Sequence, residues 1–581
     1  MRVTNQMVFG TSMNNVWRQS RHINSLIKQI ETGKRTQRPS DDPILASRAL
    51  RYRTLLSEMQ QFVRNAETGL SWMEVSEAAF FNIVDYLMER MNYRFVQGAQ
   101  TGTNDLDDQM AILTELREYF DQIALEMNQT HLGRYVFSGF HTSQPPFLKN
   151  DMPNEIFRIT QGFSPSDIRT VSSMQRFSNV ERPTITDNVH VIQLPYRGGV
   201  AAGSFAFNGL PGGMALAVVE RTLSDADAYI PLAAGTVHFI PETGELIFHA
   251  DDVADIKQDG INFDITYTRQ GFSAGEMNPM VYFRSQHIAN ATSIVGGIPG
   301  QILNSATPIP AATWPAGTHI PAGAEWPMHV TIPPGVTLQN AAGEVFVPTT
   351  VPPVVPSTGF FVAIPVAGWT APAGGYAVPF NSSVPRGTFI PAGTIIGEFD
   401  VTDHEMRFEF TSNTYVPINV LAKTAIPPNM IADFNRLFEF ADSLRRTPPS
   451  AIRDYYANTH VPNLTGQALQ NAVDTFISNE NAYFAGLLHQ RFNDMLELHE
   501  KYSTNIMREH TSLGTRMARL DMIHHRLEED EIHYTALLSR NEDADVAGTI
   551  IRRNGAQVAF RDSLQSISMM TQLSLANFIN R

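Results

Sequence analysis

The feature that most constrains the fold is a seven-residue repeat of apolar side chains at both ends of the chain. Near the N-terminus the repeat advances by alternating steps of four and three residues, with polar Ser20 in one position. This spacing is typical of a coiled-coil seam rather than of a merely amphipathic helix. Gly33 supplies a C-cap, and Pro39 blocks continuation of the helix. The predicted first seam consists of Phe9, Met13, Val16, Ile23, Ile27 and Ile30.

The repeat resumes after Pro43, breaks between 98 and 103, and then returns. Its positions are Tyr52, Leu55, Met59, Phe62, Ala66, Met73, Phe80, Val84, Leu87 and Met91, followed by Leu113, Leu116, Phe120, Ile123 and Met127. Helices in globular domains usually run about 8–20 residues, so a pattern of this length favours a coiled coil or a helical bundle.

The C-terminal end carries the same pattern in three stretches. The first comprises Phe484, Leu488, Met495, Leu498 and Tyr502, and the second comprises Leu513, Met517, Leu520, His524, Leu527, Tyr534 and Leu538, with Glu531 in its polar slot. A break at 541–545 precedes the last stretch. Its predicted seam includes Ile551, Val558, Leu564, Ile567, Met570 and Leu573.

The middle of the chain, about 145–424, loses the helical pattern. TVHFIPETGELIFHA at 236–250 predicts a β-hairpin, because two alternating runs flank a Pro-Glu-Thr-Gly turn, and INFDITYT at 261–268 also alternates. From 300 to 400 proline and glycine dominate in a loose repeat of the form WPAG or IPAG, which predicts short strands joined by tight turns. The aromatic side chains within that stretch favour a buried core over disorder. They are Trp314, Trp326, Phe346, Phe360, Phe361, Trp369, Tyr376 and Phe389.

These patterns predict a multidomain α+β fold in which the N- and C-terminal segments together form a long helical coiled coil or bundle around a large β-rich insert. We expect terminal axial-core helices at 1–38 plus 546–581, a helical rod domain at 39–144 plus 425–545, and the insert at 145–424. Two subdomains, about 145–290 and 300–424, could make up the insert. The terminal seams lack local partners, so we expect them to pack together when many copies assemble.

The composition of the chain argues against several classes of function. The 581 residues have a net charge of −15, which argues against a general nucleic-acid binder and against adhesion to anionic membranes. The absence of cysteine excludes thiol chemistry, disulfides and cysteine-based zinc sites. The N-terminal sequence does not look like a cleaved signal peptide, and no apolar run reaches the roughly 18 residues that span a bilayer.

The stretch PSDDPILASRAL at 39–50 allows three interpretations. Ser40, Asp41 and Asp42 could cap a helix that begins near Pro43. The two acidic groups could instead mark a metal or catalytic site. The stretch could also be a family signature.

Two long motifs favour the third interpretation. LIKQIETGKRTQRPSDDPILASRAL at 26–50 resembles the N-terminal signature of bacterial flagellins and their hook-associated relatives, including Ser40, Asp41, Asp42 and Pro43. LGTRMARLDMIHHRLEEDEIHYTALLSRNEDADVAGTI at 513–550 resembles the matching C-terminal signature, including Glu542, Asp543, Ala544 and Asp545. GRYVFSGFHTSQPPF at 133–147 and GFSAGEMNPMVYF at 271–283 resemble segments of the family members that join hook to filament.

The resemblance implies a structural part of the bacterial flagellum at the hook–filament junction, and not an enzyme. It implies export to the extracellular flagellum without a cleaved leader, self-association in a helical ring, and contacts with a hook-side hook-associated protein, flagellin and an export chaperone. Flagellin itself with a large outer domain, the hook-side protein, and a surface adhesin that acts through the β insert are the alternatives.

We expect no catalytic residue, cofactor or metal site. HEMRF at 404 and HEKYS at 499 lack the second histidine of a zinc protease helix. The cluster of His524, His525, Glu528, Glu529, Glu531 and His533 could bind a metal weakly, but helical spacing alone often creates such pairs, so a solvated helix face is the favoured interpretation. Asp105, Asp107 and Asp108 lack the glycine and the distant glutamate of a calcium loop, and helix capping explains them better.

Overall fold

The structure is a computed structural model that describes residues 5–36, 38–100, 105–175, 184–231, 233–290, 293–295, 298–303, 307–326, 336–340, 345–346, 362–365, 368–378, 381–402, 404–411, 413–444 and 449–579. It divides into two compact units. Unit 1 comprises Met1–Ser71, Arg407–Val416 and Arg516–Arg581, and unit 2 comprises Trp72–Met406 and Pro417–Thr515. Helical ends with a β-rich middle confirm the predicted fold class.

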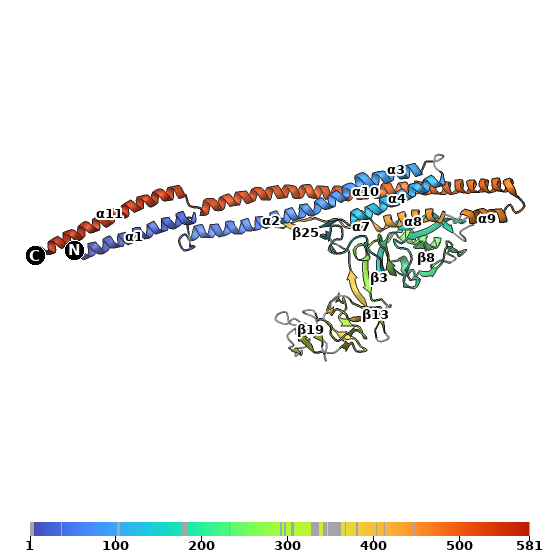
Figure 1. Cartoon of the computed structure of the whole chain (residues 1–581), viewed down its shortest axis with the longest axis horizontal. Coiled ribbons are helices and arrows are strands. Elements are labelled where there is room, and N and C mark those ends of the chain that lie inside the picture. The colour runs from blue at the N-terminus through green and yellow to red at the C-terminus, as the bar shows by residue number, and fades with distance from the viewer. Residues whose placement is uncertain are drawn as a thin grey trace. The chain divides into compact units, whose positions relative to one another are not determined.

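Unit 1 contains helices from both ends of the chain. Helix α1 (Asn5–Thr32) lies beside α11 (Val546–Ile579) in the antiparallel sense, with the two chain ends at the same end of the pair (Figure 1). The first part of α2 (Pro43–Phe81) and the last part of α10 (Gly466–Glu542) also belong to this unit. A hairpin of β25 (Arg407–Thr411) and β26 (Thr414–Pro417) contacts α2, since the Asn65 amide donates to the carbonyl oxygen of Glu409 at 2.9 Å.

The helical part of unit 2 has an aromatic core. Its helices are the end of α2, the π-helix η1 (Asn82–Met88), α3 (Glu89–Gly98), α4 (Leu106–Met127), α7 (Ala422–Ala425), α8 (Pro428–Leu444), α9 (Pro449–Thr459) and the first part of α10. Phe95 packs against Phe434 and Phe492, with ring centroids 5.9 and 6.4 Å apart. A side chain at Gly98 would meet the Phe492 ring at 2.6 Å, so only glycine allows α3 to approach α10 this closely. The predicted break after this helix is confirmed.

Two sheets dominate the insert's first half, and their strands are antiparallel except for one parallel pair, β7 (Ala217–Glu220) with β8 (Thr236–Ile240). The first has the order β24 (Ile395–Phe399), β11 (Arg284–Ile288), β3 (Met152–Phe163), β10 (Phe263–Phe272) and β6 (Ala206–Asn208). The second has the order β4 (Arg169–Gln175), β5 (Thr184–Gln193), β9 (Glu245–Phe248), β8 (Thr236–Ile240) and β7 (Ala217–Glu220). Short helices connect these strands: η2 (Pro165–Asp167), η3 (Ala202–Ser204), η4 (Pro211–Gly213), α5 (Ala250–Asp259) and α6 (Pro279–Tyr282).

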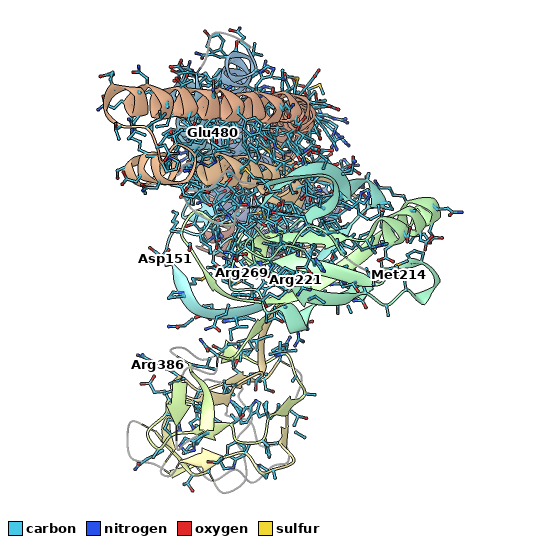
Figure 2. The ribbon with its side chains drawn as sticks, turned by 90° about the vertical axis from the view of Figure 1, so that its right-hand side faces the viewer. Asp151, Met214, Arg221, Arg269, Arg386 and Glu480 are labelled. Atoms are coloured by element: carbon cyan, nitrogen blue, oxygen red, sulfur yellow. The ribbon has the colours of Figure 1, made fainter. Side chains whose placement is uncertain are left out.

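The predicted hairpin at 236–250 is confirmed as β8 and β9. Gly244 closes its turn with a φ of 72°, which favours glycine, and its N–H donates to the carbonyl oxygen of Ile240 at 2.8 Å. Strand β10 confirms the alternation read from 261–268, because its residues are buried at every second position from Phe263 to Arg269. Arg269, labelled in Figure 2, is buried and donates to both carboxylate oxygens of Glu276 at 2.9 Å.

The proline- and glycine-rich stretch folds around a tryptophan core. Its five-stranded sheet has the order β12 (Ser293–Val295), β13 (Ile298–Ile302), β23 (Phe389–Pro391), β16 (His319–Ile320) and β20 (Trp369–Thr370). Smaller sheets pair β14 (Thr307–Pro308) with β22 (Ser383–Val384), β15 (Thr313–Trp314) with β21 (Tyr376–Ala377), and β17 (Leu338–Asn340) with both β18 (Val345–Phe346) and β19 (Val362–Pro365). A two-stranded sheet of β1 (Thr130–His131) and β2 (Arg134–Tyr135) lies earlier in the chain.

The expected tight turns recur at the Pro-x-Gly repeats. The N–H of Thr318 donates to Pro315 at 3.1 Å, and the N–H of Thr388 donates to Pro385 at 3.2 Å, in a turn that contains Arg386 (Figure 2). The glycine of each turn has a φ above 80°. This geometry matches a type II turn, in which the third position needs glycine.

The aromatic side chains expected to be buried are partly described. Trp314, Trp326 and Phe389 are buried, while Trp369 and Tyr376 are half-buried and pack against the same core. The side chains of Phe346, Phe360 and Phe361 lie outside the described part of the chain. Among the described helices, none is both long and apolar enough to cross a membrane.

Candidate assembly site at the joint of the terminal helices

The two family-like signatures meet at one joint within unit 1. Helix α1 stops at Thr32 and α10 stops at Glu542, and the two segments that follow them pair in the antiparallel sense, with Lys34 opposite Asp543. The backbone N–H of Arg35 donates to the carbonyl oxygen of Glu542 at 2.7 Å, and that of Ala544 donates to Gly33 at 2.7 Å. Residues more than 500 positions apart therefore end two helices at the same place.

Charged side chains surround these backbone bonds. The Lys34 ammonium lies 2.8 Å from Asp543 Oδ1 and 3.1 Å from Glu542 Oε2, and Arg53 forms a further ion pair with Glu542. The hydrogen bond to Asp543 raises the pKa of Lys34, and the same bond lowers the pKa of Asp543. Lys34 and Asp543 are more than 40% exposed, so the pair that these two residues form contributes no more than about 1 kcal/mol.

The acidic pair of PSDDPILASRAL satisfies backbone donors. Asp42 Oδ1 accepts from the N–H of Ile44 at 3.1 Å and of Leu45 at 3.0 Å, and α2 begins at Pro43, as the capping interpretation expects. Asp41 Oδ2 accepts from the N–H of Arg38 at 3.1 Å. Ser40 lies exposed in the turn before the helix. The capping interpretation of Asp42 is therefore confirmed.

The other signature caps α11 in the same way. Asp545 Oδ1 accepts from the N–H of Gly548 at 3.0 Å, and its carbonyl oxygen accepts from Thr549 at 2.8 Å. A side chain at Gly548 would lie 2.3 Å from the Asp545 carboxylate, so glycine leaves room for the cap. Each side of the joint thus ends one helix and caps the next.

The predicted seam of α1 is partly covered. Val16 is buried at 8% exposure, and Met13, Ile23, Ile27 and Ile30 are half-buried. The side chain of Phe9 lies outside the described residues. Leu26 is buried at 4% exposure, although the seven-residue pattern does not include it. The buried face of α1 is therefore wider than the predicted seam.

The predicted seam of α11 is largely uncovered. Ile551, Val558 and Leu564 are exposed by 71%, 59% and 44%, and Ile567 is half-buried. The Ser563 hydroxyl donates to Gln19 of α1 at 3.0 Å. Met570 and Leu573 lie in α11, but their side chains are outside the described part. In a single copy of the chain, the described seam residues of α11 therefore leave apolar surface exposed to solvent.

The polar slots of the α10 seam have partners on α2, also within unit 1. Gln60 donates to Glu531 at 3.0 Å, and Glu67 lies 4.0 Å from His524. Gln60 and Glu67 are seven residues apart, as are His524 and Glu531, so one antiparallel register places both pairs. Polar partners at seam positions specify register in coiled coils. The pattern of a single helix could not reveal these partners.

Asp105, His499 and His404, which the sequence analysis also singled out, make contacts within unit 2. Asp105 caps α4 by accepting from the N–H of Asp108 at 2.9 Å, which confirms the capping interpretation. His499 is buried, and its Nε2 donates to the carbonyl oxygen of Met88 at 3.0 Å, at the end of the π-helix. Burial lowers the pKa of His499 to about 4. His404 packs against Phe140, with ring centroids 4.8 Å apart.

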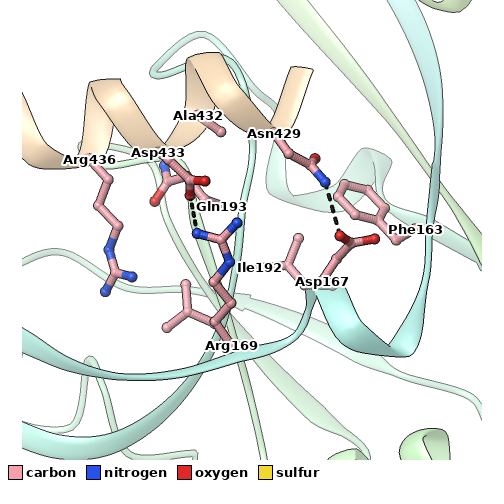
Figure 3. Close-up of a pocket in the computed structure, with 10 residues that line it drawn as sticks. Phe163, Asp167, Arg169, Ile192, Gln193, Asn429, Ala432, Asp433 and Arg436 are labelled. Carbon is pink, nitrogen blue, oxygen red and sulfur yellow. Dashed lines mark hydrogen bonds and ion pairs between the residues drawn. The ribbon is translucent and has the colours of Figure 1, made fainter. Parts of the chain in front are cut away.

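Unit 2 also holds a buried charged cluster, shown in Figure 3. Arg169 pairs with Asp433 of α8, as Figure 3 shows. Tyr502 of α10, which is not drawn there, donates to the same carboxylate. Burial alone would lower the pKa of Arg169, but the Asp433 charge, together with the interactions with Tyr502 and the hydrogen bond to Asp433, raises the pKa. The adjoining cavity of about 20 Å³ has room for about one water molecule. This cluster fastens β4 to helices α8 and α10.

The N-terminal part of the chain is similar to a known class of flagellar proteins. Residues 3–142 match the family of the bacterial flagellin N-terminal helical region. This match confirms the resemblance to flagellin-like axial proteins that the signatures predict.

Particular relatives come from the same class. Flagellar hook-associated protein 3 of Salmonella typhimurium is 28% identical over 151 residues, which are 25% of this chain and 46% of that protein. The Escherichia coli K12 protein of the same name is 27% identical over the same shares, and flagellin of that strain is 29% identical over 20% of this chain and 24% of its own length. The chain thus spans a little under half the length of the hook-associated proteins it matches.

Solved structures add a weaker likeness. The crystal structure of Xanthomonas campestris FlgL covers 84% of this chain and 99% of its own, at 13% identity and a TM-score of 0.26. The flagellar hook-associated protein-3 of Legionella pneumophila covers 84% and 97%, at 12% identity and the same TM-score. These scores are too low to support a conclusion about function.

Proposed function

We propose that this chain is a structural component of the bacterial flagellum that joins the hook to the filament. The observation that carries the proposal is the joint of unit 1, in which both family-like signatures meet, Lys34 opposite Asp543. The hook-associated protein 3 relatives at 27–28% identity favour a junction subunit within the flagellin-like class. No catalytic role enters this proposal.

The exposed seam of α11 suggests how copies associate. Ile551, Val558 and Leu564 present apolar side chains that a single chain leaves in contact with water. Full burial of an exposed side chain of this kind contributes roughly 1.5–3 kcal/mol, and these partly covered side chains would contribute a corresponding fraction. In the proposed ring, 1–38 and 546–581 form the axial core, 39–144 and 425–545 form the rod, and 145–424 forms the outer insert.

The proposed partners follow from that position. One face of the ring contacts a hook-side hook-associated protein, and the other contacts the first flagellin subunits. An export chaperone covers the exposed terminal seams before assembly. The proposed destination of the chain is the extracellular flagellum.

Electron microscopy of cells that lack this chain, with a gel of the culture medium, tests the proposal. We expect hooks without filaments and unpolymerised flagellin in the medium. Normal filaments would refute a junction role. Restoring the chain from a plasmid should restore filaments, and a copy with its joint disrupted should not.

Flagellin is the second candidate, because flagellin of Escherichia coli K12 matches at 29% identity over 119 residues. The two candidates differ in copy number, since a filament subunit is abundant and a junction subunit is scarce. In the deletion strain, bare hooks without flagellin in the medium would favour this candidate. The hook-side protein, the other axial alternative, has less support from the 133–147 segment.

An adhesin role through the insert has less support. Stacking on a sugar needs an exposed aromatic face, but Trp314 and Trp326 are buried at 0% and 3% exposure. Trp369 is half-buried and packs on Trp314, with ring centroids 5.9 Å apart. A glycan-binding assay on the full chain with a W369A variant separates this role from the junction role.

A further inference from the structure

Carboxylates from two helices of unit 1 converge on one buried imidazole nitrogen. His524 of α10 has a side chain that is 14% exposed, and its Nε2 is covered. Glu528, one turn further along α10, places Oε1 3.8 Å from this nitrogen, and Glu67 of α2 places Oε1 4.0 Å from it. These three groups come from two antiparallel helices.

The nitrogen lacks a hydrogen-bond partner among the described residues. Both carboxylate oxygens lie beyond hydrogen-bond distance, which ends near 3.2 Å for a nitrogen donor. A covered polar nitrogen without a hydrogen-bond partner destabilises the folded chain. A group placed between the nitrogen and the two oxygens would remove that destabilisation.

A divalent transition cation fits this gap. Zinc binds imidazole nitrogen and carboxylate oxygen at about 2.0–2.2 Å, so two ligands in a tetrahedral site lie roughly 3.3–3.6 Å apart. The two observed separations, 3.8 and 4.0 Å, need only small side-chain movements to reach that range. Imidazole favours zinc, nickel or copper over calcium or magnesium.

We propose that His524, Glu528 and Glu67 form a binding site for a divalent transition cation such as Zn²⁺. His525 supports the site, because its Nδ1 lies 3.3 Å from Glu528 Oε2 and can orient that carboxylate. The ligand atoms of His524 and Glu528, with those of their neighbour His525, lie within 4.8 Å of one another, and Glu67 joins this group from α2 through its 4.0 Å approach to His524 Nε2. A fourth position is left for water, as in sites with three protein ligands.

The site would act as a clip between α2 and α10. Gln60 and Glu531 form the adjacent cross-link one heptad away, at 3.0 Å. A metal bound to Glu67 and His524 would therefore fix the same helix register. From the sequence alone, a solvated helix face is the favoured interpretation of this cluster. The sequence reveals neither that Glu67 lies opposite His524 nor that His524 Nε2 is buried.

Isothermal titration of the full chain with Zn²⁺ in a non-coordinating buffer tests the proposal. We expect one site, and we expect H524Q and E67Q each to weaken binding by at least about tenfold. H533Q is the matched control, because His533 is an exposed histidine of the same helix and lies outside the proposed set. Circular dichroism of each variant reports whether α10 and α2 still form.

Co²⁺ provides a second readout, since its visible absorption reports coordination by protein ligands. We expect a Co²⁺ spectrum in wild type and H533Q that is lost in E67Q, together with a Zn²⁺-dependent rise in melting temperature that E67Q also loses. Equal Zn²⁺ affinity in wild type, H524Q and E67Q would overturn the proposal. So would loss of binding in H533Q to the same extent.

Discussion

His499 should make the stability of unit 2 depend on pH. Its side chain is 2% exposed, and its Nε2 must carry the proton that it donates, because the Met88 carbonyl can only accept. The other ring nitrogen, Nδ1, is buried without a partner among the described residues. Protonation would add a charge and an unsatisfied donor there, which is why burial lowers the pKa of His499 to about 4.

The size of the effect follows from proton linkage. The ordinary pKa of histidine is 6.5, so below that pH the unfolded chain binds a proton that the folded chain excludes until about pH 4. The stabilisation is fully present above pH 6.5 and declines as the pH falls. Between pH 7 and pH 5 the loss is about 2 kcal/mol, at 1.36 kcal/mol for each pKa unit.

The comparison is between wild type and H499Q. Glutamine can still donate to the Met88 carbonyl but does not titrate, so other histidines contribute equally to both proteins and cancel. Urea unfolding at pH 7 and pH 5 should show wild type losing about 2 kcal/mol more than H499Q. Equal denaturant slopes would confirm that the same structure unfolds. A difference between the two proteins that does not change with pH would refute the reasoning.

Three further outcomes are expected. G555A should stabilise α11 by about 0.5–1 kcal/mol through helix propensity, because open space surrounds Gly555. G548A should give no such gain, because its side chain would displace the Asp545 carboxylate that caps the helix. Circular dichroism of both variants measures their helix content. W314A should destabilise the tryptophan core by about 3–5 kcal/mol in a urea titration, and an unchanged midpoint would contradict the fold there. Limited proteolysis should cut 1–33 and 546–581 before the rest, and equal resistance would contradict the proposed exposed seams.

Local features could be predicted because their physical causes are local. The seven-residue repeat predicts the helical ends, Asp42 predicts the start of α2, and the Pro-Glu-Thr-Gly turn predicts the β8–β9 hairpin. Each of these depends on neighbours within about one turn or one hairpin.

Other features depend on residues distant in the sequence. The contact between Glu67 and His524 depends on the register of α2 against α10, two helices that lie hundreds of positions apart in the sequence. The burial of His499 against Met88 likewise follows from packing between α10 and the π-helix. A single helix pattern contains its own periodicity but not the offset of its partner, so these contacts could not be predicted from it.

Both backbone hydrogen bonds and ion pairs hold the joint between the ends of α1 and α10 together. The Lys34–Asp543 ion pair is exposed and weak, so the two backbone hydrogen bonds should hold the joint more firmly than this pair does. R35P removes the N–H that bonds to Glu542, whereas R35A keeps it and serves as the matched control. We expect R35P to speed proteolytic cleavage at 34–42 and to abolish filament attachment, and R35A and K34Q to leave both nearly unchanged. If K34Q and R35A weaken the joint as much as R35P does, side-chain charge rather than backbone pairing holds the two terminal segments together.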